Sequence, residues 1–71
     1  MDVKCSRDEQ GNIHPVSFRS GPHEYSVEAH LDTWYGGERD VWYKVRANDG
    51  NLYVLRHNGA HWTLEAFRKV A

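Results

Sequence analysis

The chain has 71 residues, with nine lysines and arginines against ten aspartates and glutamates, so its formal net charge is −1 at pH 7. This length suits one domain, and the balanced charge disfavours a strongly cationic nucleic-acid binder. The sequence contains no run of about 18 apolar residues, as a membrane span requires, and begins with no apolar signal segment. We therefore predict a cytoplasmic protein that does not enter a membrane.

The first twelve residues are mostly charged or small and polar, and they end in the turn signal Gly11-Asn12. Such a composition is typical of disordered segments, because it offers little apolar surface to bury. We predict a flexible, disordered tail over residues 1–12 and a single folded domain over residues 13–71.

Apolar and polar residues alternate with a period of two along most of the remaining chain, a pattern that predicts β-strands. Turn signals at Gly21-Pro22, Asn48-Asp49-Gly50 and Asn58-Gly59 separate the strands. Residues 32–39, which include Gly36-Gly37, are predicted to form a connecting loop. The five predicted strands cover residues 15–19, 25–31, 41–47, 52–56 and 61–66.

The turn at Asp49-Gly50 allows two strand registers. A two-residue turn would pair Val45 with Val54, whereas a three-residue loop with Gly50 in the left-handed conformation would pair Val45 with Tyr53. The choice reverses the facing of every side chain. Only the three-residue loop gathers the apolar side chains on one face, so we predict that register.

The two other hairpins are predicted to share this apolar face. A two-residue turn at Asn58-Gly59 would place Leu55 opposite Trp62, and the glycine-rich loop would place Leu31 opposite Val41. The predicted core consists of Val16, Phe18, Tyr25, Val27, Ala29, Leu31, Val41, Tyr43, Val45, Tyr53, Leu55, Trp62 and Leu64.

A sheet with one apolar face cannot leave that face in water. We therefore predict an all-β fold, a five-stranded antiparallel meander curled into a small SH3-like or OB-like barrel. Pairing of the sheet with a second copy is the alternative, which makes the protein a monomer or a weak homodimer.

The runs His14-Pro15-Val16-Ser17-Phe18, Leu31-Asp32-Thr33-Trp34 and Trp42-Tyr43-Lys44-Val45-Arg46 resemble a family of small bacterial domains of unknown function. The resemblance covers most of residues 13–66. Members of that family are often encoded beside, or fused to, Y-family translesion DNA polymerase components. The resemblance therefore implies an accessory role in DNA repair, with a polymerase component as partner and no established catalytic residues. Here Ser20-Gly21-Pro22-His23 replaces an arginine-rich turn of the family.

Two groups of residues are candidates for binding. The first is a row on the face opposite the core, where an indole beside cationic groups suits stacking and phosphate contacts with single-stranded nucleic acid. Its members are His30, Trp42, Lys44, Arg46, Arg56 and His61. The second is the loop pair Trp34 and Tyr35, of the residue types that anchor protein partners. Alternatively, the row is an ordinary solvated face and Trp34 caps the barrel end.

We expect no enzymatic activity, no cofactor and no bound metal. The serines lie in no nucleophile motif, and the single cysteine, Cys5, lies far from a candidate base. A zinc site needs about four converging ligands, which the spacing of the five histidines does not provide. The sequence thus favours a non-catalytic module that binds a protein, with weak binding of single-stranded nucleic acid as the alternative.

Overall fold

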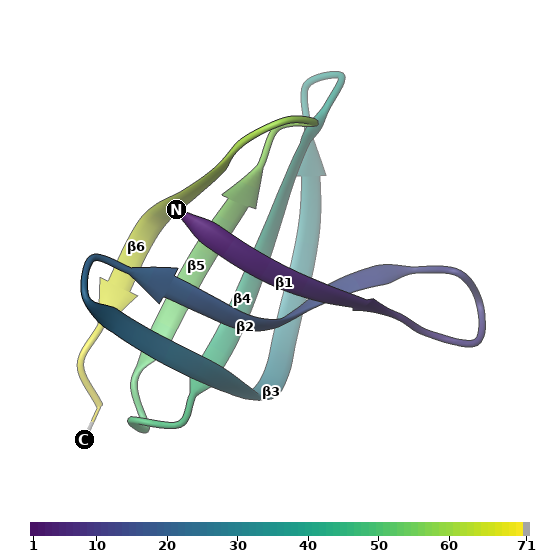
Figure 1. Ribbon diagram of the computed structural model, residues 1–71. Coiled ribbons are helices and arrows are strands. Elements are labelled where there is room, and N and C mark those ends of the chain that lie inside the picture. Colours follow the sequence, from purple (N-terminus) through teal and green to yellow (C-terminus); the bar gives the residue numbers. More distant parts are fainter. Residues whose placement is uncertain (71) are drawn as a thin grey trace.

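The computed structural model describes residues 1–70, and Figure 1 shows their arrangement. The fold is an all-β, six-stranded antiparallel meander in which each strand pairs with the next. The strands are β1 (Asp2–Arg7), β2 (Ile13–Ser20), β3 (His23–Gly36), β4 (Asp40–Ala47), β5 (Leu52–His57) and β6 (Trp62–Arg68). None of the described residues forms a helix of the length and hydropathy that a membrane span requires.

Strand β3 is long and bent, and it belongs to both halves of the sheet. Residues 23–26 pair with β2, whereas residues 27–36 pair with β4. The register shifts after Val27 and again after His30, and irregularities of this kind bend a strand. In Figure 1, β1, β2 and the first part of β3 cross in front of β4 and β5. The sheet therefore folds over on itself at β3.

The core lies between these two halves. The Phe18 ring of β2 packs against Tyr25 of β3 and Tyr53 of β5, with centroids 5.1 Å apart in each pair. The Tyr53 hydroxyl donates a hydrogen bond to the Asp49 carboxylate, and burial together with this bond raises the pKa of Tyr53. The buried core consists of Phe18, Tyr43, Val45, Ala47, Tyr53 and Leu55.

The prediction of a disordered tail over residues 1–12 was wrong, because half of this segment is strand β1 and a hydrogen-bonded turn follows it. Val3 lies opposite Phe18 in the β1–β2 register and packs against the core. The following turn is held by the Asp8 carboxylate, which accepts hydrogen bonds from the backbone N–H groups of Gln10 and Asn12. A charged strand at a sheet edge has the same composition as a disordered tail, since few of its residues face the core.

The predicted barrel closure was also wrong. Strands β1 and β6 are the two outer strands of the sheet, and they do not pair with each other in the described part of the chain. Three predicted core residues are exposed, namely Val16 at 40%, Leu31 at 46% and Leu64 at 40%. Val16 and Leu31 lie at the register irregularities of the β1–β2 and β3–β4 pairs. The fold-over at β3 buries the rings of Phe18 and Tyr53 without closing the sheet into a barrel. Strand β1, which was not predicted, adds a sixth strand at the edge of the sheet.

The predicted β4–β5 register is confirmed. Residues 48–50 form the turn, Gly50 has a φ of 83°, and Val45 lies opposite Tyr53. The left-handed conformation of Gly50 is the reason why a three-residue turn fits here, because other residue types rarely adopt it.

The predicted β5–β6 register was displaced by two residues. The loop spans residues 58–61, with the Asn58 N–H donating to the His61 carbonyl oxygen over 3.1 Å and the His61 N–H donating to Asn58 Oδ1 over 3.1 Å. Leu55 therefore lies opposite Leu64 rather than Trp62. Asn58 belongs to the turn as predicted, but as its first residue instead of as one of two central ones.

The predicted loop over residues 32–39 is mostly strand. Strand β3 continues to Gly36, and Tyr35 rather than Leu31 lies opposite Val41. Of the two adjacent glycines only Gly37 has a positive φ, 58°. Gly36 is an extended strand residue, so the glycine pair marked the end of the hairpin correctly but made the loop too long.

Replacement of Phe18 by alanine should lower the free energy of unfolding by about 3–5 kcal/mol, because it removes the ring that joins the two halves. Val16→Ala on the same strand, at a position that is 40% exposed, is the control and should cost at most about 1 kcal/mol. Urea denaturation monitored by tryptophan fluorescence measures both, and Phe18→Leu supplies a milder variant. Equal losses for Phe18→Ala and Val16→Ala would contradict this core.

Candidate functional site

The outer face of β3–β6, on the side opposite the core, carries two tryptophans in contact. Trp34 of β3 lies opposite Trp42 of β4, and their rings are inclined by only 5° with centroids 6.2 Å apart. Trp34 is 39% exposed, whereas Trp42 is half-buried. We call this surface the outer face, and it is formed by Trp34, Trp42, Lys44, Arg46, Val54 and Arg56.

A glycine within strand β3 provides space for the Trp42 indole. A Cβ atom on Gly36 would lie 2.7 Å from Cζ3 and 3.0 Å from Cη2 of Trp42. Contacts this short do not occur, so any larger residue at this position would displace the ring. Gly36 thus lets the indole lie directly against the β3 backbone, beside Trp34.

Arg56 lies opposite Trp42 on β5, and two carboxylates hold its guanidinium. Nη1 donates a hydrogen bond to Glu65 Oε1 over 3.1 Å, and Nε lies 3.6 Å from Asp40 Oδ1. Nε is buried and makes no hydrogen bond within the described residues, so Asp40 compensates its charge at slightly longer range. One cation between two carboxylates gives this cluster a formal charge of −1.

An apolar groove continues the outer face from the tryptophans toward the other end of β5. It encloses about 190 Å³. Its lining residues are Lys44, Leu52, Val54, Ala66, Phe67 and Arg68. The ion pairs found among residues 1–70 join Arg19 to Glu24 and Arg56 to its two carboxylates, and they do not include Lys44, Arg46 or Arg68.

Four residues of the predicted row share the outer face. Trp42, Lys44 and Arg46 are alternate residues of β4, with the buried Tyr43 and Val45 between them. Arg56 is their neighbour on β5. The confirmed β4–β5 register is what aligns these four side chains.

The two histidines of the predicted row lie elsewhere. His30 is on the other side of β3, where its ring centroid is 5.8 Å from that of the buried Tyr43 and 6.5 Å from that of His14. His61 lies in the β5–β6 turn, and Thr63 instead occupies the position opposite Arg56. The bulges in β3 and the longer β5–β6 turn account for both displacements.

The predicted pair Trp34 and Tyr35 does not form one site. Neighbouring residues of a strand point to opposite faces, so Trp34 joins Trp42 on the outer face while Tyr35, which is 77% exposed, points to the other side. The contact between the tryptophans was not predicted, because Trp34 was expected to lie in a loop. The signal for a longer strand was the run Thr33-Trp34-Tyr35, because β-branched and aromatic residues favour strands.

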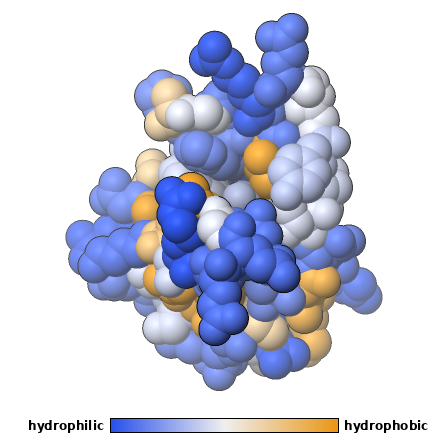
Figure 2. Space-filling view, turned by 90° about the vertical axis from the view of Figure 1, so that its right-hand side faces the viewer, coloured by the Kyte–Doolittle hydropathy of each residue, from blue (hydrophilic) through white to orange (hydrophobic). Residues whose placement is uncertain are grey.

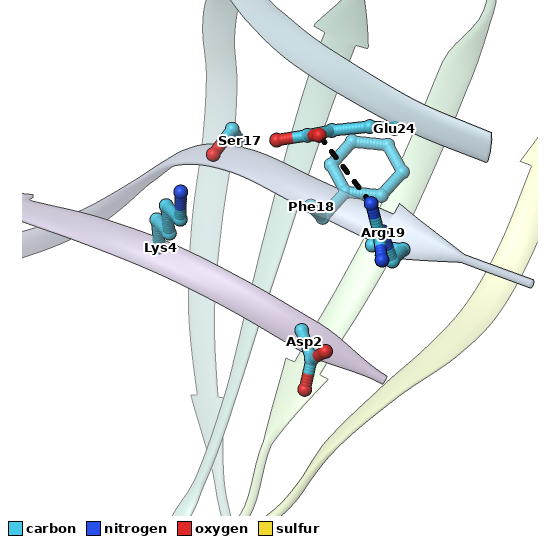
Figure 3. Close-up of a pocket in the computed structure, with 6 residues that line it drawn as sticks. All are labelled: Asp2, Lys4, Ser17, Phe18, Arg19 and Glu24. Atoms are coloured by element: carbon cyan, nitrogen blue, oxygen red, sulfur yellow. Dashed lines mark ion pairs between the residues drawn. The ribbon is translucent and has the colours of Figure 1, made fainter. Parts of the chain in front are cut away.

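Another hollow lies over β1, β2 and the start of β3. It encloses about 280 Å³ and is lined by Asp2, Lys4, Ser17, Phe18, Arg19 and Glu24. Figure 3 shows Arg19 and Glu24 together beside the Phe18 ring, where their ion pair spans 3.8 Å, while Asp2 points away from them. Charges of both signs alternate here, so the hollow favours no ligand of one sign.

A smaller hollow lies where β2 separates from β3, beside the β1–β2 turn. It encloses about 190 Å³, and its lining includes His14, His30, Tyr35 and Asp8. The pKa of Asp8 is lowered, chiefly by the hydrogen bond from the Asn12 backbone. Figure 2 views the molecule from the side of this turn and shows a mostly hydrophilic surface with hydrophobic residues in separate areas. This side thus offers no broad apolar docking surface.

No three histidine, cysteine, aspartate or glutamate side chains of residues 1–70 are grouped so that they could hold a metal ion. Comparisons of the chain with known protein families, curated proteins and solved structures find no match. The resemblance to small bacterial domains stays a prediction, and the outer face is interpreted from its own chemistry.

Gly36→Ala should displace the Trp42 indole and lower the free energy of unfolding by about 1–3 kcal/mol, as overpacking does. Near-ultraviolet circular dichroism and the indole N–H resonances of Trp34 and Trp42 should change with it. In a Trp42→Phe background Gly36→Ala should lower the free energy of unfolding by less, because the smaller ring relieves the clash. The double-mutant cycle should give an interaction energy of about 0.5 kcal/mol or more. Additive effects of the two substitutions would show that Gly36 does not position the indole.

Proposed function

We propose that this protein is a non-catalytic β domain that binds a protein partner through its outer face, centred on Trp34 and Trp42. The observation that carries the proposal is the stacked pair, in which Trp34 is 39% exposed on a solvent-facing side of the sheet. Tryptophan is enriched among the residues that contribute most to protein interfaces. A ring held by its neighbours also has little conformational freedom left to lose on binding.

The state of Arg56 favours a protein over a nucleic acid as partner. Its guanidinium is already occupied by Glu65 and Asp40, and the phosphates of a nucleic acid would have to compete with these carboxylates. The two histidines that would have extended the positive row, His30 and His61, do not lie on this face. The tryptophan end of the outer face is therefore apolar and bordered by a cluster of net negative charge.

The resemblance of residues 13–66 to bacterial domains associated with translesion polymerases adds the biological setting of this proposal. On that basis a polymerase component is the first partner to test, and the domain would act as an accessory factor in DNA repair. The binding surface is proposed from the geometry of the tryptophans and does not depend on this setting.

Trp34→Ala should reduce partner binding by about tenfold or more, since truncation of a central interface tryptophan is costly. Tyr35→Ala is the matched control, because Tyr35 is the next residue of β3 and points to the opposite side. Affinity capture from a bacterial extract and with purified polymerase components, quantified by mass spectrometry, measures both variants. Equal capture by the two variants would contradict a binding site on the outer face.

A second candidate, single-stranded nucleic acid, is favoured by Lys44, Arg46 and Arg68, which form no ion pair within residues 1–70. Short single-stranded DNA should then shift the amide resonances of Trp42 and Lys44 at low salt. The binding constant for the DNA should fall as salt is added. A plot of its logarithm against the logarithm of the salt concentration should have a slope of about −0.7 for each phosphate contact. An unchanged spectrum at low salt, or salt-independent binding, would exclude this candidate.

A further inference from the structure

We infer that the groove beside the tryptophans selects a partner segment that is both acidic and apolar. This inference rests on the proposed protein-binding function and names the chemistry of the segment that the outer face recognises. It is carried by the lining of the groove and by the basic side chains around it.

The floor of the groove is apolar. Leu52 and Val54 of β5 and Ala66 of β6 contribute to it, and the two β5 side chains are only half-buried by the domain itself. The volume of about 190 Å³ is below the range of about 300–1,000 Å³ that is usual for small-molecule sites. The groove therefore suits individual apolar side chains of a peptide better than a separate small ligand.

Basic side chains flank this floor from both neighbouring strands. Lys44 lies opposite Val54 on β4, and Arg68 lies opposite Leu52 on β6. Arg46, which is exposed, lies opposite Leu52 on the β4 side. Three cations around one apolar floor attract carboxylates, and a carboxylate bound there would meet little competition from the domain.

The carboxylate that lies opposite Lys44 on β3 forms no ion pair with it. Asp32 lies opposite Lys44 in the β3–β4 register, but its Oδ1 accepts the backbone N–H of Thr33 over 2.8 Å, and no ion pair joins it to Lys44. Arg56 shows the contrasting arrangement, because its guanidinium is held by two carboxylates. The groove end of the outer face is thus positive and the Arg56 end is negative, so the acidic residues of a bound segment belong at the groove.

The spacing on β4 specifies how such a segment would lie. Trp42 and Lys44 are two positions apart on one strand, so their Cα atoms lie about 6.6–6.8 Å apart. An apolar side chain over the tryptophans and a carboxylate at Lys44 can therefore come from nearby positions of one extended segment. A partner that is only acidic would leave the groove floor and the indoles uncovered.

The test uses the full chain labelled with ¹⁵N and a synthetic peptide in which aspartate and leucine or phenylalanine lie two positions apart, so that both side chains point to the same face of an extended segment. At low salt this peptide should shift the amide resonances of Lys44, Leu52, Val54 and Ala66. Two control peptides separate the contributions: one carries lysine in place of aspartate, and the other carries serine in place of the apolar residues. Both controls should bind more weakly by about tenfold or more.

Lys44→Glu should weaken binding of the acidic peptide by about tenfold or more. Lys4→Glu is the matched control, because it makes the same charge change on β1 and should alter the affinity by less than about twofold. Equal effects of the two variants, or equal affinity for the lysine peptide, would overturn the inference. Concentration-dependent shifts of the groove residues without peptide would identify a second copy as the occupant and would overturn it as well.

This inference and the proposed function fail in different ways. If Trp34→Ala loses its partner while the acidic peptide does not bind, the outer face binds protein but the partner chemistry assigned here is wrong. If Trp34→Ala and Tyr35→Ala capture partners equally, the proposed function itself is wrong.

Discussion

The packing of Phe18 against Tyr53 is the contact on which the rest of the structure depends, because it joins the two halves of one folded sheet. A chain of about this length buries only about 60% of the surface exposed when it is unfolded. No helix covers the sheet within residues 1–70, and the single cysteine cannot form an intramolecular disulfide. Apolar side chains can then leave water only if the sheet turns over on itself, which the bends in β3 allow.

This solution does not require large apolar residues on the outer face, so the composition of that face is informative. An ordinary solvent-facing side of a sheet needs no large apolar residues, yet Trp34 and Trp42 lie together there. Gly36, the last residue of β3, adds a second departure, because a glycine in a strand often marks the close approach of another group. Here the close approach is the Trp42 indole. Local rules that a sequence breaks without benefit to the core are expected at functional sites.

Period-two alternation and turn residues predicted five of the six strands, because both signals are local. The charged strand β1 was not predicted, since at a sheet edge only Val3 needs to face the core.

Only part of the candidate site was predicted, because the position of its residues depends on the strand registers. The register of β4 and β5 depends on the short turn at Gly50, and it correctly aligned Trp42 with Arg56. His30 was misplaced because an extra residue in a bulge changes the facing of the residues beyond it, and alternation alone does not reveal a bulge.

The arrangement of charge on the outer face shows why composition alone could not decide between partners. The whole chain is almost neutral, which says little about any one surface. On the outer face Arg56 is compensated by Asp40 and Glu65, whereas Lys44 has no ion-pair partner in the described chain. Arg56 and Lys44 thus carry the same formal charge on adjacent strands but differ in their surroundings. Arg56 forms ion pairs beside the tryptophans, whereas the ammonium group of Lys44 stays unpaired within residues 1–70. The strand register therefore decides which cations the fold leaves uncompensated next to exposed apolar surface, and the recognition proposed for this domain depends on that choice.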